Sequence, residues 1–137
     1  MLRIFISGSS AGLGLMAADK LISQGHKVVL HARNADRAED ARRELPKTEA
    51  IVMGDVETIA GAKDIAAQVN ALGHFDAVIH NAAVGYREGH RVTTDGLPHV
   101  FAINTLSAYI NYDRADSAPE TAHLSQFRHA SPCGRQS

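Results

Sequence analysis

Three glycines near the amino terminus have the spacing of a loop that binds phosphate. Gly8, Gly12 and Gly14 follow a short apolar run and precede an alanine-rich segment of helical period. Glycine adopts backbone angles that other residues avoid, and it leaves room for a ligand to approach the backbone. The N–H groups at a helix start, at the positive end of its dipole, suit a phosphate. Because an apolar run precedes the glycines and a helical segment follows them, we expect nucleotide binding rather than a bare structural turn.

The segments that must position this loop alternate between apolar runs and helical periods. Strands are predicted over residues 2–7, 27–32, 49–53 and 75–80. Helices are predicted over 13–24, 35–45 and 58–72, with Gly25 ending the first, Asn34 or Asp36 capping the second and Thr58 capping the third. The strands are continuous apolar runs, which is typical of a parallel sheet covered by helices on both faces.

Less regular sequence follows the fourth predicted strand. Residues 84–93 are polar and predict a loop. Thr94 is then expected to cap an amphipathic segment over residues 97–110.

Four motifs stand in order along these elements. They are Ser-Gly-Ser-Ser-Ala-Gly-Leu-Gly at residues 7–14, Asp55-Val56, His80-Asn81-Ala82-Ala83, and Asn104 within a helical segment. With these motifs, residues 1–110 resemble the N-terminal part of the short-chain dehydrogenases/reductases, which are NAD(P)-dependent Rossmann-fold enzymes. The resemblance implies an α/β fold, a Rossmann-like doubly wound parallel sheet that is incomplete at about four strands. Residues 1–110 would be the NAD(P)-binding domain.

The resemblance also implies which residues form the site. Ligands of an open parallel sheet bind outside the carboxyl ends of the strands, where the strand order reverses. The implied catalytic residue is Asn104, and no metal is expected. The implied cofactor-binding residues are Gly8, Ser9, Ser10, Gly12, Leu13, Gly14, Arg33, Asn34, Asp55, Val56, Asn81, Ala82 and Ala83.

The end of the second predicted strand bears on the choice of cofactor. NAD sites usually place an acidic residue there, and this chain has His31-Ala32-Arg33-Asn34 instead. A cation at Arg33 can pair with the 2′-phosphate of NADP, and Ser9 or Ser10 could add a hydroxyl donor. A lone arginine can equally be a solvated loop cation, but in this motif context NADP is expected and NAD less so.

The residues that move the proton in this family have no counterpart here. The family uses a serine, a tyrosine and a lysine four residues after that tyrosine. Positions four beyond Tyr86, Tyr109 and Tyr112 are His90, Asp113 and Asp116. We therefore expect cofactor binding at best and no turnover from this chain.

The last stretch departs from the family pattern. Residues 111–137 are polar and without helical or strand period, which predicts disorder. One hypothesis is a reading-frame shift at Tyr112. If the codons from Tyr112 onward are read one base later, permitted codon choices spell an apolar helix end and a strand that ends in Ser-Ser. A divergent natural tail is the other. A sheet that stops at the fourth strand would leave that strand an exposed edge, which predicts a marginal, aggregation-prone or partner-dependent fold.

Composition narrows the classes of protein to which this chain can belong. The 137 residues carry a formal net charge of −1 and 45% hydrophobic residues, which favours a globular cytoplasmic domain over a nucleic-acid or membrane binder. The single cysteine, Cys133, excludes an internal disulfide. Eight scattered histidines do not have the spacing of metal ligands.

Two functions remain open on these grounds. One is an NADP-dependent oxidoreductase acting on a small carbonyl or alcohol substrate, with this chain truncated or frameshifted and a homo-oligomer in keeping with the family. The alternative is a non-catalytic NAD(P)-binding fragment or sensor. A Tyr-x-x-x-Lys motif in the parent gene would distinguish them.

Overall fold

Strands and helices alternate along the chain, as the sequence predicts. The computed structural model describes residues 1–83, 91–99 and 102–106. Within these residues the strands are β1 (Arg3–Ile6), β2 (Lys27–Ala32), β3 (Ala50–Met53) and β4 (Ala77–Ile79). The helices are α1 (Gly12–Ser23), α2 (Ala35–Glu44) and α3 (Ile59–Ala71), followed by a π-helical turn at Ala102–Leu106.

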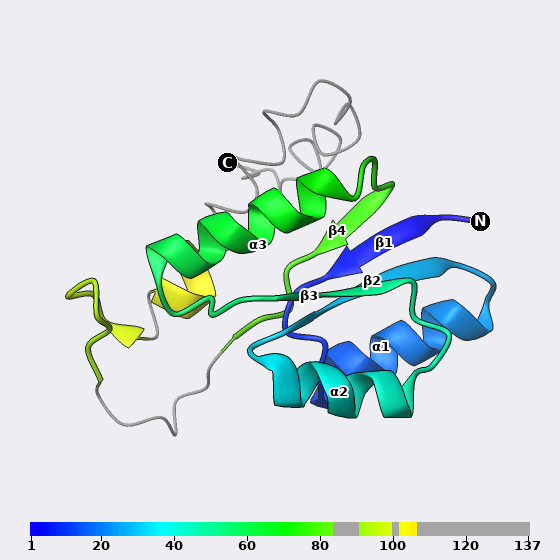
Figure 1. Cartoon of the computed structure of the whole chain (residues 1–137), viewed down its shortest axis with the longest axis horizontal. Coiled ribbons are helices and arrows are strands. Elements are labelled where there is room, and N and C mark those ends of the chain that lie inside the picture. Colours follow the sequence, from blue (N-terminus) through cyan, green and yellow to red (C-terminus); the bar gives the residue numbers. More distant parts are fainter. Residues whose placement is uncertain (84–90, 100–101, 107–137) are drawn as a thin grey trace, which may run out of the picture.

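The four described strands form one parallel sheet in the order β3-β2-β1-β4 (Figure 1). The chain moves outward from β1 to β2 and β3, and then returns past β1 to form β4. The order therefore reverses between β1 and β4, whose carboxyl ends lie side by side. This is the doubly wound, Rossmann-like α/β fold that was expected, and its reversal point is where such sheets bind ligands.

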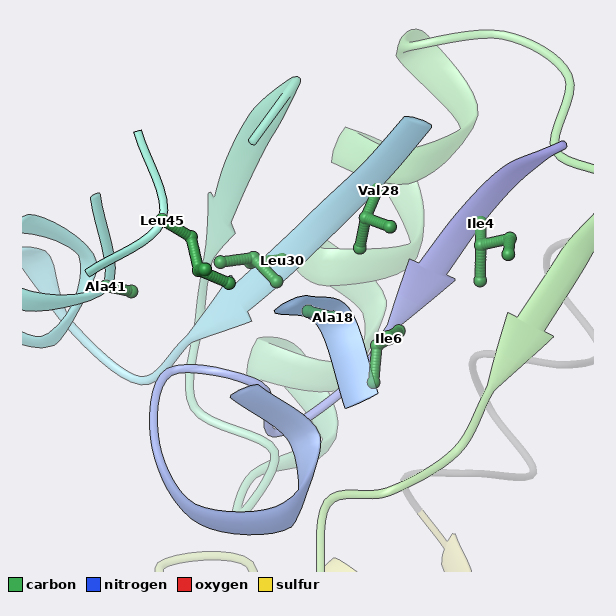
Figure 2. Packing of buried hydrophobic residues seen from close by; sticks show 7 residues of the cluster. All are labelled: Ile4, Ile6, Ala18, Val28, Leu30, Ala41 and Leu45. Carbon is green, nitrogen blue, oxygen red and sulfur yellow. The ribbon is translucent and has the colours of Figure 1, made fainter. Parts of the chain in front are cut away.

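Each face of the sheet packs against its own helices. On one face Ile4 and Ile6 of β1 pack with Val28 and Leu30 of β2 against α1 and α2 (Figure 2). On the other face Phe5, Val29 and Val52 pack against Ile65 and Val69 of α3. Because neighbouring strand residues point to opposite faces, β1 and β2 are apolar at consecutive positions, over residues 4–6 and 28–30. Figure 1 shows α3 on one side of the sheet and α1 with α2 on the other.

The ends of two helices are fixed by capping side chains. Asn34 accepts a hydrogen bond from the Arg37 amide at 3.0 Å, and Thr58 accepts one from the Gly61 amide at 2.9 Å. Asn34, rather than Asp36, is therefore the cap of α2. Helix α1 ends at Ser23, and Gly25 just beyond it has a φ of +88°, which allows the amides of Gly25 and His26 to bond back to Ile22 and Leu21.

Two of the later elements are present but have other bounds than expected. Strand β4 has three residues rather than six: at its start the Arg3 amide bonds the Asp76 side chain at 2.8 Å, and beyond Ile79 the amides of Asn81 and Ala82 bond the Ser7 hydroxyl. The helical segment expected from Leu97 is present at His99 and as the π-helical turn at Ala102–Leu106, with the Ala102 amide bonding the Pro98 carbonyl at 2.9 Å. It does not start at Leu97 behind a Thr94 cap, because residues 94–97 form a turn in which the Thr93 amide bonds the Leu97 carbonyl at 2.8 Å and Gly96 has a φ of +75°. Residues 84–90 of the expected loop, the expected domain boundary at 110 and the expected tail lie outside the described residues.

The described sheet has β4 at one edge. Strand β4 pairs with β1, and its Ile79 is 39% exposed. No helix in the described part of the chain is long and apolar enough to span a membrane.

Candidate functional site

The turn between β1 and α1 depends on a glycine at position 8. Gly8 has a φ of +62°, a conformation that costs other residues about 1–2 kcal/mol. A Cβ at Gly8 would also stand 2.7 Å from the Cα of Ala82, closer than real atoms approach. The first glycine of the motif is therefore required twice, by its backbone angle and by the close passage of the chain after β4.

The start of α1 is open. Its N-cap is Ala11, whose methyl side chain makes no capping hydrogen bond. Gly12 follows with a φ of +61°, and a Cβ there would meet nothing within 4 Å. The first N–H groups of a helix need partners from outside the helix, and here the cap residue supplies none. This end of α1 can accept an anionic group.

The carboxyl ends of β1 and β4 are joined by two polar side chains. The buried Ser7 hydroxyl accepts hydrogen bonds from the amides of Asn81 at 3.0 Å and Ala82 at 3.1 Å. The Asn81 side chain donates from Nδ2 to the Gly8 carbonyl at 3.0 Å. A Cβ at Gly14 would stand 2.6 Å from that nitrogen, so the third glycine of the motif makes room for Asn81.

The glycine loop is joined to β2 through Ser9 and His31. The Ser9 hydroxyl is fully buried, donates to the Ile6 carbonyl at 2.7 Å and accepts from the His31 amide at 2.8 Å. Its hydrogen is therefore already used, and of the two serines Ser10 is the one that lines the cleft.

The His31 ring is buried between the loop and the end of β3. Nδ1 accepts a hydrogen bond from the Gly8 amide at 2.9 Å, and Nε2 lies 2.7 Å from the Gly54 carbonyl. Burial lowers the pKa of His31, outweighing the Gly54 hydrogen bond and the Asp55 carboxylate, which both raise it. The ring is therefore neutral near pH 7.

A cleft of about 590 Å³ opens at the reversal point of the sheet. Nine of the predicted cofactor-binding residues line it: Gly8, Ser10, Leu13, Arg33, Asp55, Val56, Asn81, Ala82 and Ala83. Four others do not, because Ser9 is buried, Asn34 caps α2, and Gly12 and Gly14 have no side chains but shape the loop. Asn104 is exposed on the π-helical turn, whereas its neighbour Ile103 lines the cleft.

Charged side chains gather at one end of the cleft, around Glu57. Its carboxylate accepts from Arg91 Nη2 at 2.9 Å and lies 4.0 Å from Arg33 Nη2. The Glu57 side chain is 17% exposed and that of Arg33 64%. Arg91 Nη2 also donates to His99 Nε2 at 2.7 Å. Arg33 is thus loosely held and can turn toward an anionic ligand.

Sequence reasoning missed seven residues of this cleft, and four of them have ionisable side chains: His31, Glu57, Arg91 and His99. A histidine near the carboxyl end of an otherwise apolar strand was a usable signal for His31, because such a residue is buried and needs partners. Arg91 and His99 had no such signal, since their placement depends on the turn at residues 93–97. The described residues contain no group of three or more metal-ligating side chains.

Comparison with known proteins gives one family. A family model described as short chain dehydrogenase matches residues 3–115. An uncharacterized oxidoreductase of Emericella nidulans is 52% identical over 112 residues, which cover 80% of this chain and 44% of that protein. A short-chain dehydrogenase of Gibberella zeae is 41% identical over 110 residues, covering 80% and 42%.

A solved structure agrees in fold. L-sorbose reductase from Gluconobacter frateurii, determined with NADPH and L-sorbose, superposes with a TM-score of 0.69 at 26% identity. The match covers 82% of this chain and 45% of the reductase. The chain thus spans less than half the length of each of these three proteins.

Proposed function

The chain belongs to the short-chain dehydrogenase family, and from that membership we propose that its cleft binds NADP(H). The observation that carries the proposal is the uncapped start of α1, where Ala11 makes no capping hydrogen bond and a Cβ at Gly12 would meet nothing within 4 Å. The pyrophosphate of a dinucleotide fits this position, because its negative charge faces unpaired N–H groups and the positive end of the helix dipole.

We assign the rest of the dinucleotide from the strand ends that line the cleft. The adenosine half is assigned to the end that holds Arg33, Asp55 and Val56, and the nicotinamide half to the side of Asn81 to Ala83. Asn34 and Ser9 are proposed to support this site without lining the cleft. Asn34 caps α2, and the Ser9 hydroxyl bonds the glycine loop to β2. Asn104 is proposed to support the active site of the full-length enzyme.

The preference for NADP over NAD rests on Arg33. No carboxylate stands directly at the end of β2 to accept a ribose hydroxyl, and the Arg33 side chain is 64% exposed, with Glu57 Oε2 4.0 Å from its Nη2. A hydrogen bond to a charged group contributes about 1.5–3 kcal/mol, which corresponds to roughly a ten- to hundredfold preference for the 2′-phosphate. The L-sorbose reductase that superposes on this chain was determined with NADPH, which agrees with this assignment.

In the full-length relative, the proposed reaction is hydride transfer between NADP(H) and a small carbonyl or alcohol substrate. This chain would supply the cofactor-binding half. A second candidate is a non-catalytic NAD(P)-binding module, and the observation favouring it is that no tyrosine in the printed sequence has a lysine four residues later. Reading the parent gene for a Tyr-x-x-x-Lys motif separates the two candidates, because neither predicts NADPH oxidation by this chain.

The cofactor assignment is tested by titrating the wild-type chain and the Arg33→Ala variant with NADPH and with NADH. We expect the variant to lose most of the preference for NADPH while its NADH affinity changes little. Arg42→Ala is the matched control, because Arg42 is an exposed arginine on α2 that does not line the cleft. Equal loss of NADPH affinity in both variants, or equal wild-type affinities for the two cofactors, would contradict the NADP assignment.

A further inference from the structure

His31 connects parts of the cleft that are distant in the chain. Its ring bonds the Gly8 amide in the glycine loop and the Gly54 carbonyl after β3. Its backbone bonds Ser9 twice, through its amide at 2.8 Å and its carbonyl at 3.2 Å. His31 of β2 therefore bonds both the glycine loop and the residue that follows β3.

The two ring contacts define a single protonation state. The Gly8 amide is a donor, so Nδ1 must be an unprotonated acceptor. The Gly54 carbonyl is an acceptor, so Nε2 must carry the hydrogen. Only the neutral Nε2–H form satisfies both partners. A proton added to Nδ1 would turn an N–H toward the Gly8 N–H and remove that hydrogen bond.

The loop end of this connection is sensitive to loss of the bond. Gly8 has a left-handed backbone and passes within contact distance of Ala82, so little tolerance remains for moving it. The open amides of the α1 start lie directly after this turn. A change at Gly8 therefore alters the position of the groups that would face a pyrophosphate.

We propose that His31 is a positioning residue for dinucleotide binding: its neutral imidazole couples the glycine loop to the end of β3, and protonation of the ring uncouples them. This proposal rests on the proposed function. It predicts that the affinity for a dinucleotide falls on acidification because the His31 ring takes up a proton, and not because the ligand does. The lowered pKa of His31 places this loss below neutral pH rather than at it.

Other charged groups near His31 must be separated from it. The ionisable residues that line the same cleft are Arg33, Asp55, Glu57, Arg91 and His99. Asp55, beyond β3, is the one whose charge acts on the His31 ring. From the end of β4, Asn81 and Ala82 contribute no charge. His99 is the other imidazole in the lining and needs its own control.

The test measures NADH affinity from about pH 8 to about pH 5.5 in wild-type protein and in His31→Gln, His31→Leu and His99→Gln variants. NADH is chosen because it has no 2′-phosphate, whose own ionisation falls in this range. Wild-type affinity should fall roughly tenfold, as expected for one lost hydrogen bond. His31→Gln offers an oxygen acceptor and an N–H donor that do not titrate, so its affinity should stay nearly constant with pH. His31→Leu should bind weakly throughout, and His99→Gln should retain the wild-type pH dependence.

Nuclear magnetic resonance of the wild-type chain provides a second readout that needs no variant. The ¹⁵N shifts of His31 should show the Nε2–H tautomer, and the Gly8 amide shift should follow the titration of that ring. Identical pH profiles in wild type and His31→Gln would overturn the positioning role alone. So would a Gly8 amide shift that does not change as the His31 ring titrates. If no dinucleotide binds at any pH, the proposed function fails and this role fails with it.

Discussion

The Asn81 side chain donates a hydrogen bond to the Gly8 carbonyl at 3.0 Å, across 73 residues of chain. This bond joins the ends of β1 and β4, the two strands between which the sheet order reverses. Gly14 has no side chain, which leaves room for the Asn81 amide against the first turn of α1. The glycine motif and the asparagine therefore form one structural unit, although the sequence presents them as separate motifs.

Replacing Asn81 by aspartate should destabilise the fold and weaken binding. The amide donor would become a carboxylate oxygen facing the Gly8 carbonyl, and the loss should be about 1–3 kcal/mol in the free energy of unfolding. Urea titration measures it. Asn34→Asp is the matched control, because aspartate caps a helix about as well as asparagine and stability should change little. Equal stability of Asn81→Asp and wild type would show that the bond to Gly8 does not hold the two strand ends together.

Gly8 and Gly12 form a natural pair for separating backbone strain from steric conflict. Both have a φ near +60°, but a Cβ at Gly8 meets the Ala82 backbone at 2.7 Å and one at Gly12 meets nothing within 4 Å. Gly8→Ala should therefore lose about 1–3 kcal/mol more stability than Gly12→Ala, because it adds overpacking to a similar strain. Comparison of the two urea midpoints checks this. Equal losses would mean that the chain after β4 moves aside freely.

Glu57 should weaken the interaction with a 2′-phosphate. Its carboxylate bonds Arg91 at 2.9 Å and lies 4.0 Å from Arg33, so it offsets part of the positive charge that the phosphate requires. Glu57→Gln should raise NADPH affinity severalfold and leave NADH affinity nearly unchanged; partly exposed pairs contribute about 0.2–1 kcal/mol. Fluorescence titration with both cofactors measures this. A drop in NADPH affinity would instead show that Glu57 holds the arginines in their binding positions.

The stability of the fold should depend on pH through His31. Burial lowers the His31 pKa, so the unfolded chain binds this proton more tightly than the folded one. Stability is therefore full above about pH 6.5 and falls as pH decreases below that value, by at most about 1.4 kcal/mol per pH unit. The decline from this group ends once the pH passes below the folded pKa. Urea midpoints of wild type and His31→Gln across this range should diverge on acidification; parallel curves would contradict the account.

The sequence predicted the parts of the fold that depend on local patterns. The run at 27–32 is β2 without change, and the Asn34 and Thr58 caps lie at the predicted helix starts. The predicted doubly wound sheet and the resemblance to the short-chain dehydrogenases are both confirmed. These features follow from residue period and turn chemistry, which a single sequence displays directly.

Features that depend on distant contacts were not predictable in the same way. Strand β4 is shorter than its apolar run, because the Ser7 hydroxyl takes the amides of Asn81 and Ala82 away from a strand ladder. The helical segment expected from Leu97 starts later, because Asp95 bonds the Ile59 amide at 2.8 Å and Gly96 has a φ of +75°, which makes residues 94–97 a turn packed on the start of α3. Glu57, Arg91 and His99 meet only because of that packing. The assignment of individual cofactor contacts and of Asn104 stays a prediction.

The central claim is that the start of α1 binds the pyrophosphate of a dinucleotide. Isothermal titration calorimetry of the wild-type chain with NADPH, and with ADP-ribose as a ligand that keeps the pyrophosphate but lacks nicotinamide, tests it most directly. We expect saturable one-to-one binding of both ligands, with NADPH the tighter. Absence of binding heat with both ligands, in protein shown to be folded, would contradict the claim.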